Sequence, residues 1–410
     1  MLALGLDPVR GIGARGTVVA VLYESIEGWF DFDDIYELAI RRCGSKPARF
    51  VEVGAYKGRS TCYLAERIAE TGLDIRFDVV DTFAGDPHVG HGDLYEEFAA
   101  NLERAGLLST LCTHRCLSVD AAAAFADQTL DFVFIDAAHS FDAVSCDLAA
   151  WWPKLRQGGL IAGHDYTHGP EVKAAVDGFV AARGLGRAFR PSRHSWLIYK
   201  ALTIDAAYCI NLARRPDRRR MAAAEFETAG LSARVAFFDA IDGSLLAHSG
   251  AVSDGQGGCC MSHLAVLRAA LIKGHRNVLI FEDDVQLAED FTPRLDAAMA
   301  RCPASYDLCY VGAICRASWG NFLYPFDDLL ARAGSVCGTH AYVANLDCQP
   351  AIEASLGGVR NVIDNWYANE LQPRGNCYVC TPYLAAQSSG FSDVAKEFNA
   401  NGSYADYVWR

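Results

Sequence analysis

The sequence lacks a long hydrophobic run, an excess of positive charge and a linker rich in proline, glycine or serine. No apolar stretch reaches the length of a membrane span, and residues 1–22 show no basic start followed by a continuous apolar core. The net charge of −13 disfavours broad binding to nucleic acids or anionic membranes, because such binding surfaces are usually basic. We therefore expect a cytoplasmic protein with no signal peptide, no transmembrane segment and no nucleic-acid partner. A peripheral position at the inner face of the membrane stays open.

The 15 cysteines are scattered along the chain, so we expect reduced thiols and no zinc-binding array among them. At 410 residues the chain is too long for one ordinary hydrophobic core, which predicts two domains. A strand that ends near Lys200 and a new strand that starts at Ala207 place the boundary between them. We predict a helical lead-in over residues 1–46, a first domain over 47–202 and a second domain over 203–410.

Strand-like and helical segments alternate in the first half, which is typical of a doubly wound α/β sheet. We expect its strands at 49–53, 77–80, 131–135, 159–163 and 195–200, and its helices at 31–42, 60–71, 143–155 and 171–182. The second half repeats this alternation with more irregular connections. Its expected strands are 207–212, 278–281 and 308–311, and its expected helices are 218–229 and 262–273.

Glycines join the first strand to its helix, at Gly54 and Gly58. Glycine lets the backbone approach a ligand closely, and a helix N-terminus favours an anionic group. Asp81 closes the next strand, where a carboxylate can accept both hydroxyls of a ribose. A dinucleotide-binding enzyme is the competing interpretation, but the GxGxxG spacing is missing and Glu52 precedes the first glycine.

Acidic and histidine side chains follow two further apolar strands of this half. Asp136 and His139 follow one strand, and His164 and Asp165 follow the next. The carboxyl ends of parallel strands gather at one edge of the sheet, where ligands bind. As alternatives, His139 caps the helix that begins near Asp142, and His164 is a buried hydrogen-bonding residue.

With these motifs, residues 47–200 resemble the class I S-adenosylmethionine-dependent methyltransferases. The resemblance points to the branch of metal-dependent macrolide-sugar O-methyltransferases of the macrocin and mycinamicin type. It implies that Asp136, His164 and Asp165 bind a metal and that His139 is the general base. Since His164 stands where an acidic residue is usual, the metal is either held by the two aspartates alone or absent. The residues that the resemblance places at the methyl donor are Glu52, Gly54, Gly58 and Asp81, with Ser118 near its adenine.

A strand that ends in three carboxylates marks the second half: Glu282, Asp283 and Asp284 follow the apolar run 278–281. In an extended chain Glu282 and Asp284 point to the same side, so two oxygens can converge on one divalent cation. The alternative is an acidic turn that faces solvent.

An arginine-rich strand-to-helix junction precedes this acidic end, with Asn211, Arg214, Arg215 and Arg218 around Pro216. Proline suits the first helical turn, and the free amides there would help the arginines to hold a diphosphate. An ordinary solvated helix start is the alternative. Farther along the chain, the segment 257–268 contains Ser262, which we expect to be the N-cap of a helix.

These three blocks, together with segments 361–367, 381–387 and 392–394, resemble glycosyltransferase family 25, the lipopolysaccharide-type and collagen-type sugar transferases. The resemblance covers residues 206–395 and implies a GT-A-like fold, a nucleotide-sugar donor and inversion at the anomeric carbon. It implies that Glu282 and Asp284 bind manganese or magnesium. Asp364 is the candidate base, with Asp283 second; as alternatives, Asp364 caps a helix or orients the acceptor. Ser262 and His263 shape the pocket. The residues that would hold the nucleotide are Asn211, Arg214, Arg215 and Arg218.

The sequence as a whole predicts an α/β enzyme in which an O-methyltransferase is fused to a glycosyltransferase. We expect S-adenosylmethionine, a divalent metal and a uridine-diphosphate-linked sugar as cofactors and donor. The expected acceptor is a carbohydrate or glycolipid in cell-surface glycan or lipopolysaccharide synthesis, and a homodimer is an open expectation. One alternative keeps the glycosyltransferase active beside a non-catalytic binding or dimerisation module. Another treats both halves as glycan- or nucleotide-binding scaffolds.

Overall fold

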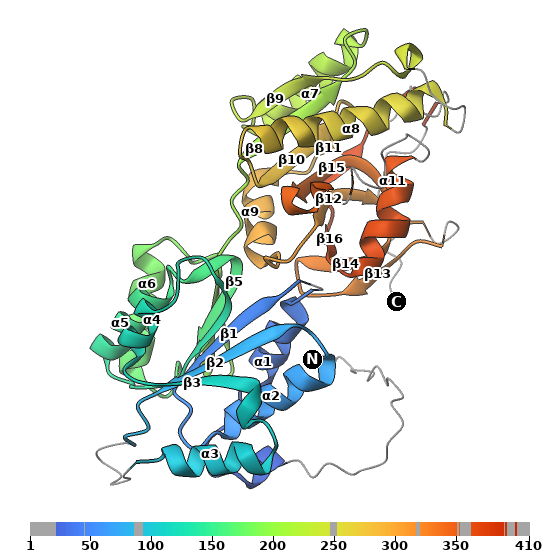
Figure 1. The fold of residues 1–410 in the computed structure, drawn as a ribbon. Coiled ribbons are helices and arrows are strands. Elements are labelled where there is room, and N and C mark those ends of the chain that lie inside the picture. The colour runs from blue at the N-terminus through green and yellow to red at the C-terminus, as the bar shows by residue number, and fades with distance from the viewer. Residues whose placement is uncertain are drawn as a thin grey trace.

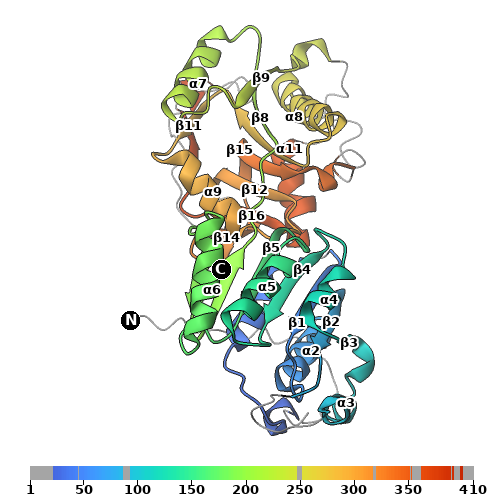
Figure 2. The same cartoon turned by 90° about the vertical axis from the view of Figure 1, so that its left-hand side faces the viewer.

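The computed structural model describes residues 22–44, 46–85, 93–246, 252–316, 320–350, 352, 362–388, 390–391 and 398–399. Two α/β domains lie end to end, each built around its own sheet (Figures 1 and 2). The predicted boundary at residues 202 and 203 falls between the last strand of the first sheet and the first strand of the second. Segments 392–394 and 1–21, on which some sequence predictions fall, lie outside the described residues, as does residue 361.

The first sheet has seven strands in the order β3-β2-β1-β4-β5-β7-β6. Strands β1 to β5 pair in parallel, while β7 runs antiparallel to both β5 and β6. The predicted doubly wound parallel sheet is therefore confirmed. Its strands are β1 (Ala48–Val53), β2 (Ile75–Asp81), β3 (Leu111–Arg115), β4 (Leu130–Ile135), β5 (Leu155–Gly163), β6 (Phe189–Ser192) and β7 (Ser195–Tyr199).

Helices cover both faces of this sheet. One face packs against α1, α2 and α3, and the other against α4, α5 and α6. The helix α1 lies in the predicted lead-in, yet its Tyr36 is fully buried against the sheet, so this helix belongs to the core of the first domain. The bounds are α1 (Asp33–Arg42), α2 (Arg59–Thr71), α3 (Tyr95–Arg104), α4 (Ser118–Ala123), α5 (Phe141–Trp151) and α6 (Pro170–Ala182).

The second domain has an eight-stranded mixed sheet in the order β13-β14-β16-β12-β15-β10-β8-β9. Strands β8, β9 and β10 are parallel, and β15 runs antiparallel to both β10 and β12. Two small pairs, β11 with β17 and β18 with β19, complete the described strands. The bounds are β8 (Ala206–Asn211), β9 (Val235–Asp239), β10 (Asn277–Glu282), β11 (Val285–Leu287), β12 (Leu308–Ile314), β13 (Phe322–Pro325), β14 (Leu330–Ser335), β15 (Cys337–Asn345), β16 (Cys377–Cys380), β17 (Ala385–Gln387), β18 (Gly390–Phe391) and β19 (Phe398–Asn399).

One helix of the second domain starts earlier than the sequence predicts. The main helices are α7 (Pro216–Thr228), α8 (Asp254–Ile272), α9 (Phe291–Arg301) and α11 (Ile363–Trp366). Ser253 rather than Ser262 is the N-cap of α8, and Gln256 completes a capping box. Ser262 lies within α8, where its hydroxyl donates to the carbonyl of Gly258. The expected cap at Ser262 was therefore wrong. Glycine has a low helix propensity, so the sequence does not predict a helix at this point. Gly258 is nevertheless required within α8, because a Cβ there would lie 2.6 Å from the carbonyl oxygen of Ile241.

Two further expectations can be compared with the described residues. All 15 cysteines lie among them and none forms a disulfide, as expected for reduced thiols. None of the helices in the described part of the chain is long and apolar enough to cross a membrane.

A buried carboxylate ties two helices to the first strand. Glu52 on β1 is 1% exposed and accepts hydrogen bonds from the hydroxyls of Tyr36 on α1 and of Ser60 and Thr61 on α2. Burial raises the pKa of Glu52 to about 7, against the effect of these hydroxyl donors. The carboxyl group therefore titrates near neutral pH while it holds the strand-to-helix turn in place.

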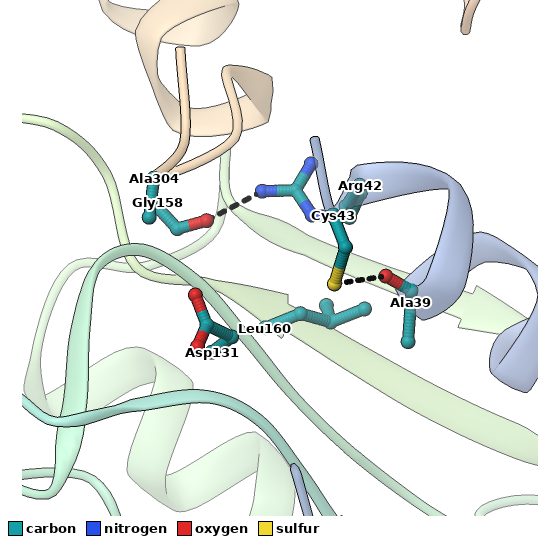
Figure 3. A pocket seen from close by; sticks show the side chains of 7 residues that line it. All are labelled: Ala39, Arg42, Cys43, Asp131, Gly158, Leu160 and Ala304. Carbon is teal, nitrogen blue, oxygen red and sulfur yellow. Dashed lines mark hydrogen bonds between the residues drawn. The ribbon is translucent and has the colours of Figure 1, made fainter. Parts of the chain in front are cut away.

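Paired arginines fasten the two domains together. Arg42, at the end of α1, donates to the carbonyl of Gly158 in the first domain at 2.7 Å and to that of Arg301 in the second domain at 2.5 Å. Figure 3 shows Arg42 reaching Gly158 in a small pocket that Ala304 also lines. The guanidinium groups of Arg42 and Arg301 both lie over the ring of Tyr199. Because Arg42 is buried and bonded on both sides, the domain contact is specific rather than a loose tether.

The Glu52→Gln substitution tests the buried carboxyl group. A carboxyl group whose pKa is raised in the folded state favours folding at low pH, and this contribution is lost as the pH rises through about 7. Between pH 5 and pH 8 the wild-type chain should lose about 2–3 kcal/mol of unfolding free energy that the variant retains. Denaturant unfolding at the two pH values measures this difference. Equal losses in both proteins would contradict the assignment.

The Arg42→Met substitution tests the domain contact. It leaves two buried carbonyls without their charged donor, and we expect a loss of about 2–4 kcal/mol in stability. Calorimetry should then resolve separate transitions for the two domains. The exposed neighbour provides the control, since Arg41→Met should leave the unfolding profile unchanged. A single transition at the wild-type temperature in the Arg42 variant would show that the contact does not couple the domains.

Candidate functional sites

The turn after β1 is shaped by close contacts with protein atoms. Gly54 and Gly58 have positive φ angles of 91° and 88°, a backbone region that favours glycine. A Cβ on Gly54 would lie 2.0 Å from the carbonyl oxygen of Asp136, and one on Gly58 would lie 2.9 Å from the ring of Phe98. Both glycines are therefore required by neighbouring protein groups. Their predicted contact with a methyl donor stays a prediction.

The other residues predicted at the methyl donor surround this turn. The carboxylate of Asp81 accepts hydrogen bonds from the amides of Ala55 and Tyr56 in the turn, at 2.7 and 3.0 Å. Ser118 begins α4, and its hydroxyl accepts a hydrogen bond of 2.9 Å from the indole nitrogen of Trp151. Glu52 lies in the interior beneath the turn, as described above. The structure thus gathers Glu52 and Asp81 around one strand-to-helix junction at the carboxyl edge of the sheet.

The three predicted metal ligands of the first domain lie together. Donor atoms of Asp136, His164 and Asp165 are all within 4.8 Å of one another, beyond the ends of β4 and β5. The Nδ1 atom of His164 is 3.3 Å from Asp165 and 3.9 Å from Asp136. Asp165 has a φ of 60°, which is uncommon for a residue other than glycine. Two carboxylates and one imidazole that converge in this way form a donor set that fits manganese or iron better than magnesium.

His139 lies between the two carboxylates of this cluster. Its Nε2 atom is 3.4 Å from Asp136 and 3.1 Å from Asp165, and its side chain is 55% exposed. Ser140, and not His139, caps the helix α5. The other ring nitrogen of His164, Nε2, lies 2.8 Å from the carboxylate of Asp31, and this contact fixes the orientation of the ring. An exposed imidazole beside two carboxylates can accept a proton from a bound hydroxyl group.

In the second domain, a buried network joins the arginine-rich junction to the acidic strand end. Asn211 at the end of β8 donates to Asp283 at 2.7 Å, and Arg218 on α7 donates to the same carboxylate at 2.8 Å. Arg218 is also 3.5 Å from Asp284. Pro216 occupies the first turn of α7, as expected. Both oxygens of Asp283 are therefore used in positioning, although burial still raises the pKa of its carboxyl group.

The two carboxylates predicted to share a cation differ in their surroundings. Strand β10 ends at Glu282, and Asp283 and Asp284 form a turn, so the side-chain alternation of an extended strand does not reach Asp284. Burial would raise the pKa of Glu282, but hydrogen bonds from His263 and Thr339 lower it. Burial and the neighbouring charge of Glu282 raise the pKa of Asp284.

One oxygen of Asp284 is left over in this arrangement. Its Oδ1 atom is buried and has no hydrogen-bond partner from another residue in the described part of the chain. A buried carboxylate oxygen without a partner is costly, and a cation beside Glu282 would satisfy it. The donor set therefore fits a divalent cation. The sharing of that ion by Glu282 and Asp284 stays a prediction.

The remaining predicted residues lie around this strand end. Arg214 is paired with Asp242 at 3.2 Å, and Arg215 with Asp217 at 2.8 Å, so both arginines have acidic partners near the start of α7. Asp364 lies in the first turn of α11, where its carboxylate accepts a hydrogen bond of 2.8 Å from the amide of Asn365. Burial raises the pKa of Asp364, and Glu282 adds to the rise.

Sequence reasoning missed two residues that contact the two sites, Asp31 and Thr339, and did not foresee the contact of a third, His263, with Glu282. Asp31 binds His164, Thr339 donates to Glu282 at 2.6 Å, and His263 reaches Glu282 at 3.3 Å. His263 was expected only to shape the pocket. A signal for it was present, since Cys259 and His263 are four residues apart and share one face of a helix. For Asp31 and Thr339 no local spacing reveals the contact.

Two family models match the chain. A model described as a methyltransferase domain matches residues 51–166, and the model of glycosyltransferase family 25, described as an LPS biosynthesis protein, matches residues 204–314. The matched segments contain both strand-end clusters described above. The match to the methyltransferase domain also supports binding of S-adenosylmethionine by the first domain.

Curated relatives match only part of the chain. A human protein named "Inactive glycosyltransferase 25 family member 3" is 31% identical over 163 residues, which is 34% of this chain and 26% of the relative. A Drosophila melanogaster protein named "Glycosyltransferase 25 family member" is 30% identical over 166 residues, or 35% of this chain and 27% of the relative. The chain thus spans about a quarter of the length of these relatives.

Solved structures of two methyltransferases are similar to parts of the chain. The O-methyltransferase NovP is 21% identical, with a TM-score of 0.34 over 40% of this chain and 79% of NovP. The O-methyltransferase TomG from Streptomyces achromogenes, solved with S-adenosylmethionine, is 16% identical, with a TM-score of 0.31 over 42% of this chain and 81% of TomG. The two family models match consecutive parts of the chain, a methyltransferase domain in the first half and a domain of glycosyltransferase family 25 in the second.

Proposed function

We propose that the second domain transfers a sugar from a nucleotide-sugar donor, with inversion, and that the first domain O-methylates a sugar hydroxyl. The observation that supports sugar transfer best is the buried strand end, where Oδ1 of Asp284 has no hydrogen-bond partner from another residue among those that the structure describes. The match to glycosyltransferase family 25 over this segment supports the same activity. The donor we propose is a uridine-diphosphate sugar.

In this proposal Glu282 and Asp284 hold a divalent cation, manganese or magnesium, which offsets the charge that develops on a leaving diphosphate. Arg218 and Asn211 keep Asp283 in place, so the carboxylates at the strand end stay fixed while the donor binds. Arg214 and Arg215 lie at the same junction and bind the nucleotide by exchanging their acidic partners for phosphate oxygens.

Asp364 is the proposed general base for the acceptor hydroxyl. Burial raises the pKa of its carboxyl group, which makes the carboxylate a stronger base. Asp283 is the weaker candidate, because Asn211 and Arg218 occupy both of its oxygens. Asp283 therefore acts in positioning, and Asp364 takes the proton.

For the first domain we propose that His139 takes the proton of a sugar hydroxyl while S-adenosylmethionine supplies the methyl group. Asp136, His164 and Asp165 would hold a divalent cation, which lowers the pKa of a coordinated hydroxyl. The half-exposed position of His139 between Asp136 and Asp165 leaves it accessible to an acceptor. The Asp31 carboxylate keeps His164 oriented.

We further propose that both domains act on one carbohydrate or glycolipid of the cell surface. The two sites lie on one chain whose domains are in contact through Arg42, which raises the local concentration of one product at the other site. The human relative is named inactive. The alternative to two activities is therefore a chain in which one domain is an enzyme and the other only binds its ligand. The experiments below separate these cases.

Sugar transfer should depend on the carboxylates of β10. A panel of nucleotide sugars is scored for hydrolysis and thermal stabilisation, with manganese present and then chelated. We expect one uridine-diphosphate sugar to respond only with manganese. The Glu282→Ala and Asp284→Asn variants should lose about 100- to 1,000-fold in rate, because a charge-stabilising group is removed.

The exposed Glu289 provides the matched control, and Glu289→Gln should keep the wild-type rate. Transfer that continues undiminished after chelation, or in the Asp284→Asn variant, would contradict the proposed role of the strand end.

Methyl transfer should depend on His139. The His139→Ala variant is expected to lose about 100- to 10,000-fold in methyl transfer to a glycosylated acceptor, since a general base is removed. Sugar transfer by the same variant should continue, and so should S-adenosylmethionine binding. Labelled methyl incorporation and binding calorimetry measure the two effects.

The variant His275→Ala, in the second domain, is the control and should methylate normally. If the wild-type protein binds S-adenosylmethionine but methylates neither the acceptor nor its glycosylated product, the first domain is a binding module instead.

A further inference from the structure

A second set of metal-binding side chains lies beside the acidic strand end. Cys259 and His263 are on α8, and Glu282 closes β10. The sulfur, an imidazole nitrogen and a carboxylate oxygen of these residues all lie within 4.8 Å of one another. In a tetrahedral zinc site such donors lie about 3.4–3.6 Å apart, as follows from the usual zinc–ligand distances. Small side-chain movements would therefore suffice to close the set around one ion.

The imidazole of His263 is oriented as a metal ligand would be. The side chain is 1% exposed, and its Nδ1 lies 2.9 Å from the hydroxyl of Tyr342, while its Nε2 faces Glu282 at 3.3 Å. The hydroxyl of Tyr342 can either donate to Nδ1 or accept a proton from it. When it donates, Nε2 carries the proton and donates to Glu282; when it accepts, Nε2 presents the lone pair that a metal ion needs.

The local charge also favours a cation at this place. The Cys259 thiol lies in the field of three carboxylates, those of Glu282, Asp364 and Asp284. Sulfur and imidazole ligands select zinc and similar ions over magnesium or manganese, which prefer oxygen donors. Four-residue spacing along α8 places Cys259 and His263 on one face of the helix. Geometry, orientation and charge thus point to the same kind of ligand.

We propose that Cys259, His263 and Glu282 form a binding site for a thiophilic divalent cation of the zinc class, next to the sugar-nucleotide site. On binding, the thiol proton of Cys259 passes to solvent and the thiolate sulfur bonds the metal. With three protein ligands, the fourth position is left for water. This site goes beyond the proposed sugar transfer, because it needs only the described contacts and no enzymatic activity.

Glu282 belongs to both sites, which gives the metal a regulatory consequence. An ion held by Cys259 and His263 draws Glu282 toward α8 and away from Asp284. Zinc is therefore expected to compete with manganese at the strand end and to lower sugar transfer. Raising the manganese concentration should relieve the inhibition in the wild-type protein.

Cobalt(II) provides the direct probe, because a thiolate ligand gives a near-ultraviolet charge-transfer band that oxygen and nitrogen ligands do not. We expect metal-free wild-type protein to develop this band on titration with cobalt, up to one thiolate-bound ion per chain, and zinc to displace it. The Cys259→Ser variant should lack the band. The neighbouring buried thiol provides the matched control, since Cys260→Ser should keep the band at full intensity.

A second variant tests the role of Tyr342 as a positioning residue. Tyr342→Phe removes the hydroxyl that orients His263 and should weaken zinc binding about 10- to 100-fold, while the cobalt band keeps its shape. Circular dichroism confirms that each variant is folded before titration.

No band in the wild-type protein, or an equal band in the Cys259→Ser variant, would overturn the proposed site. A band in a protein that transfers no sugar would leave the site standing and reject only the proposed sugar transfer.

Discussion

Repulsion among three adjacent carboxylates at the end of β10 is the constraint around which the second domain is organised. Arg218 of the β8–α7 junction offsets the charge of Asp283, and Asn211 donates a hydrogen bond to the same carboxylate. Glu282 contacts His263 and Thr339, and one buried oxygen of Asp284 has no partner from another residue in the described part of the chain. A protein interior tolerates such an arrangement when a cation completes it. The proposed sugar transfer depends on a cation that compensates the remaining negative charge of Glu282 and Asp284.

Local patterns in the sequence predict the strands and the strand ends well, but not the partners that meet there. Apolar runs such as 278–281 predict buried strands, and their carboxyl ends predict where acidic residues gather. The start of α8 was missed because Gly257 and Gly258 lower helix propensity, while close packing against Ile241 requires glycine. The helix predicted over 143–155 ends earlier in the structure, where α5 stops at Trp151, because Pro153 cannot continue it. Contacts such as Thr339 with Glu282 join residues far apart in the chain, so no local spacing reveals them.

In the first domain, too, the sequence predicts the residues at the strand ends but not the distant residues that contact them. The strand-end positions of Asp136, His164 and Asp165 follow from the parallel sheet, and the structure brings these residues together. The support of His164 by Asp31 comes from the segment before α1, which no motif linked to this site. Arg42 at the other end of α1 reaches into the second domain. The predicted lead-in thus supports His164 through Asp31, which precedes α1, and contacts the second domain through Arg42 at the end of α1.

Quantitative manganese binding, followed by electron paramagnetic resonance in the presence of uridine diphosphate, tests the central claim most directly. The account predicts that the wild-type protein removes one equivalent more of the free-ion signal than the Asp284→Asn variant, because the first-domain cluster of Asp136, His164 and Asp165 is the same in both proteins. Equal manganese binding by both proteins would mean that the buried Oδ1 atom of Asp284 serves no cation, and the account of the second domain would be contradicted.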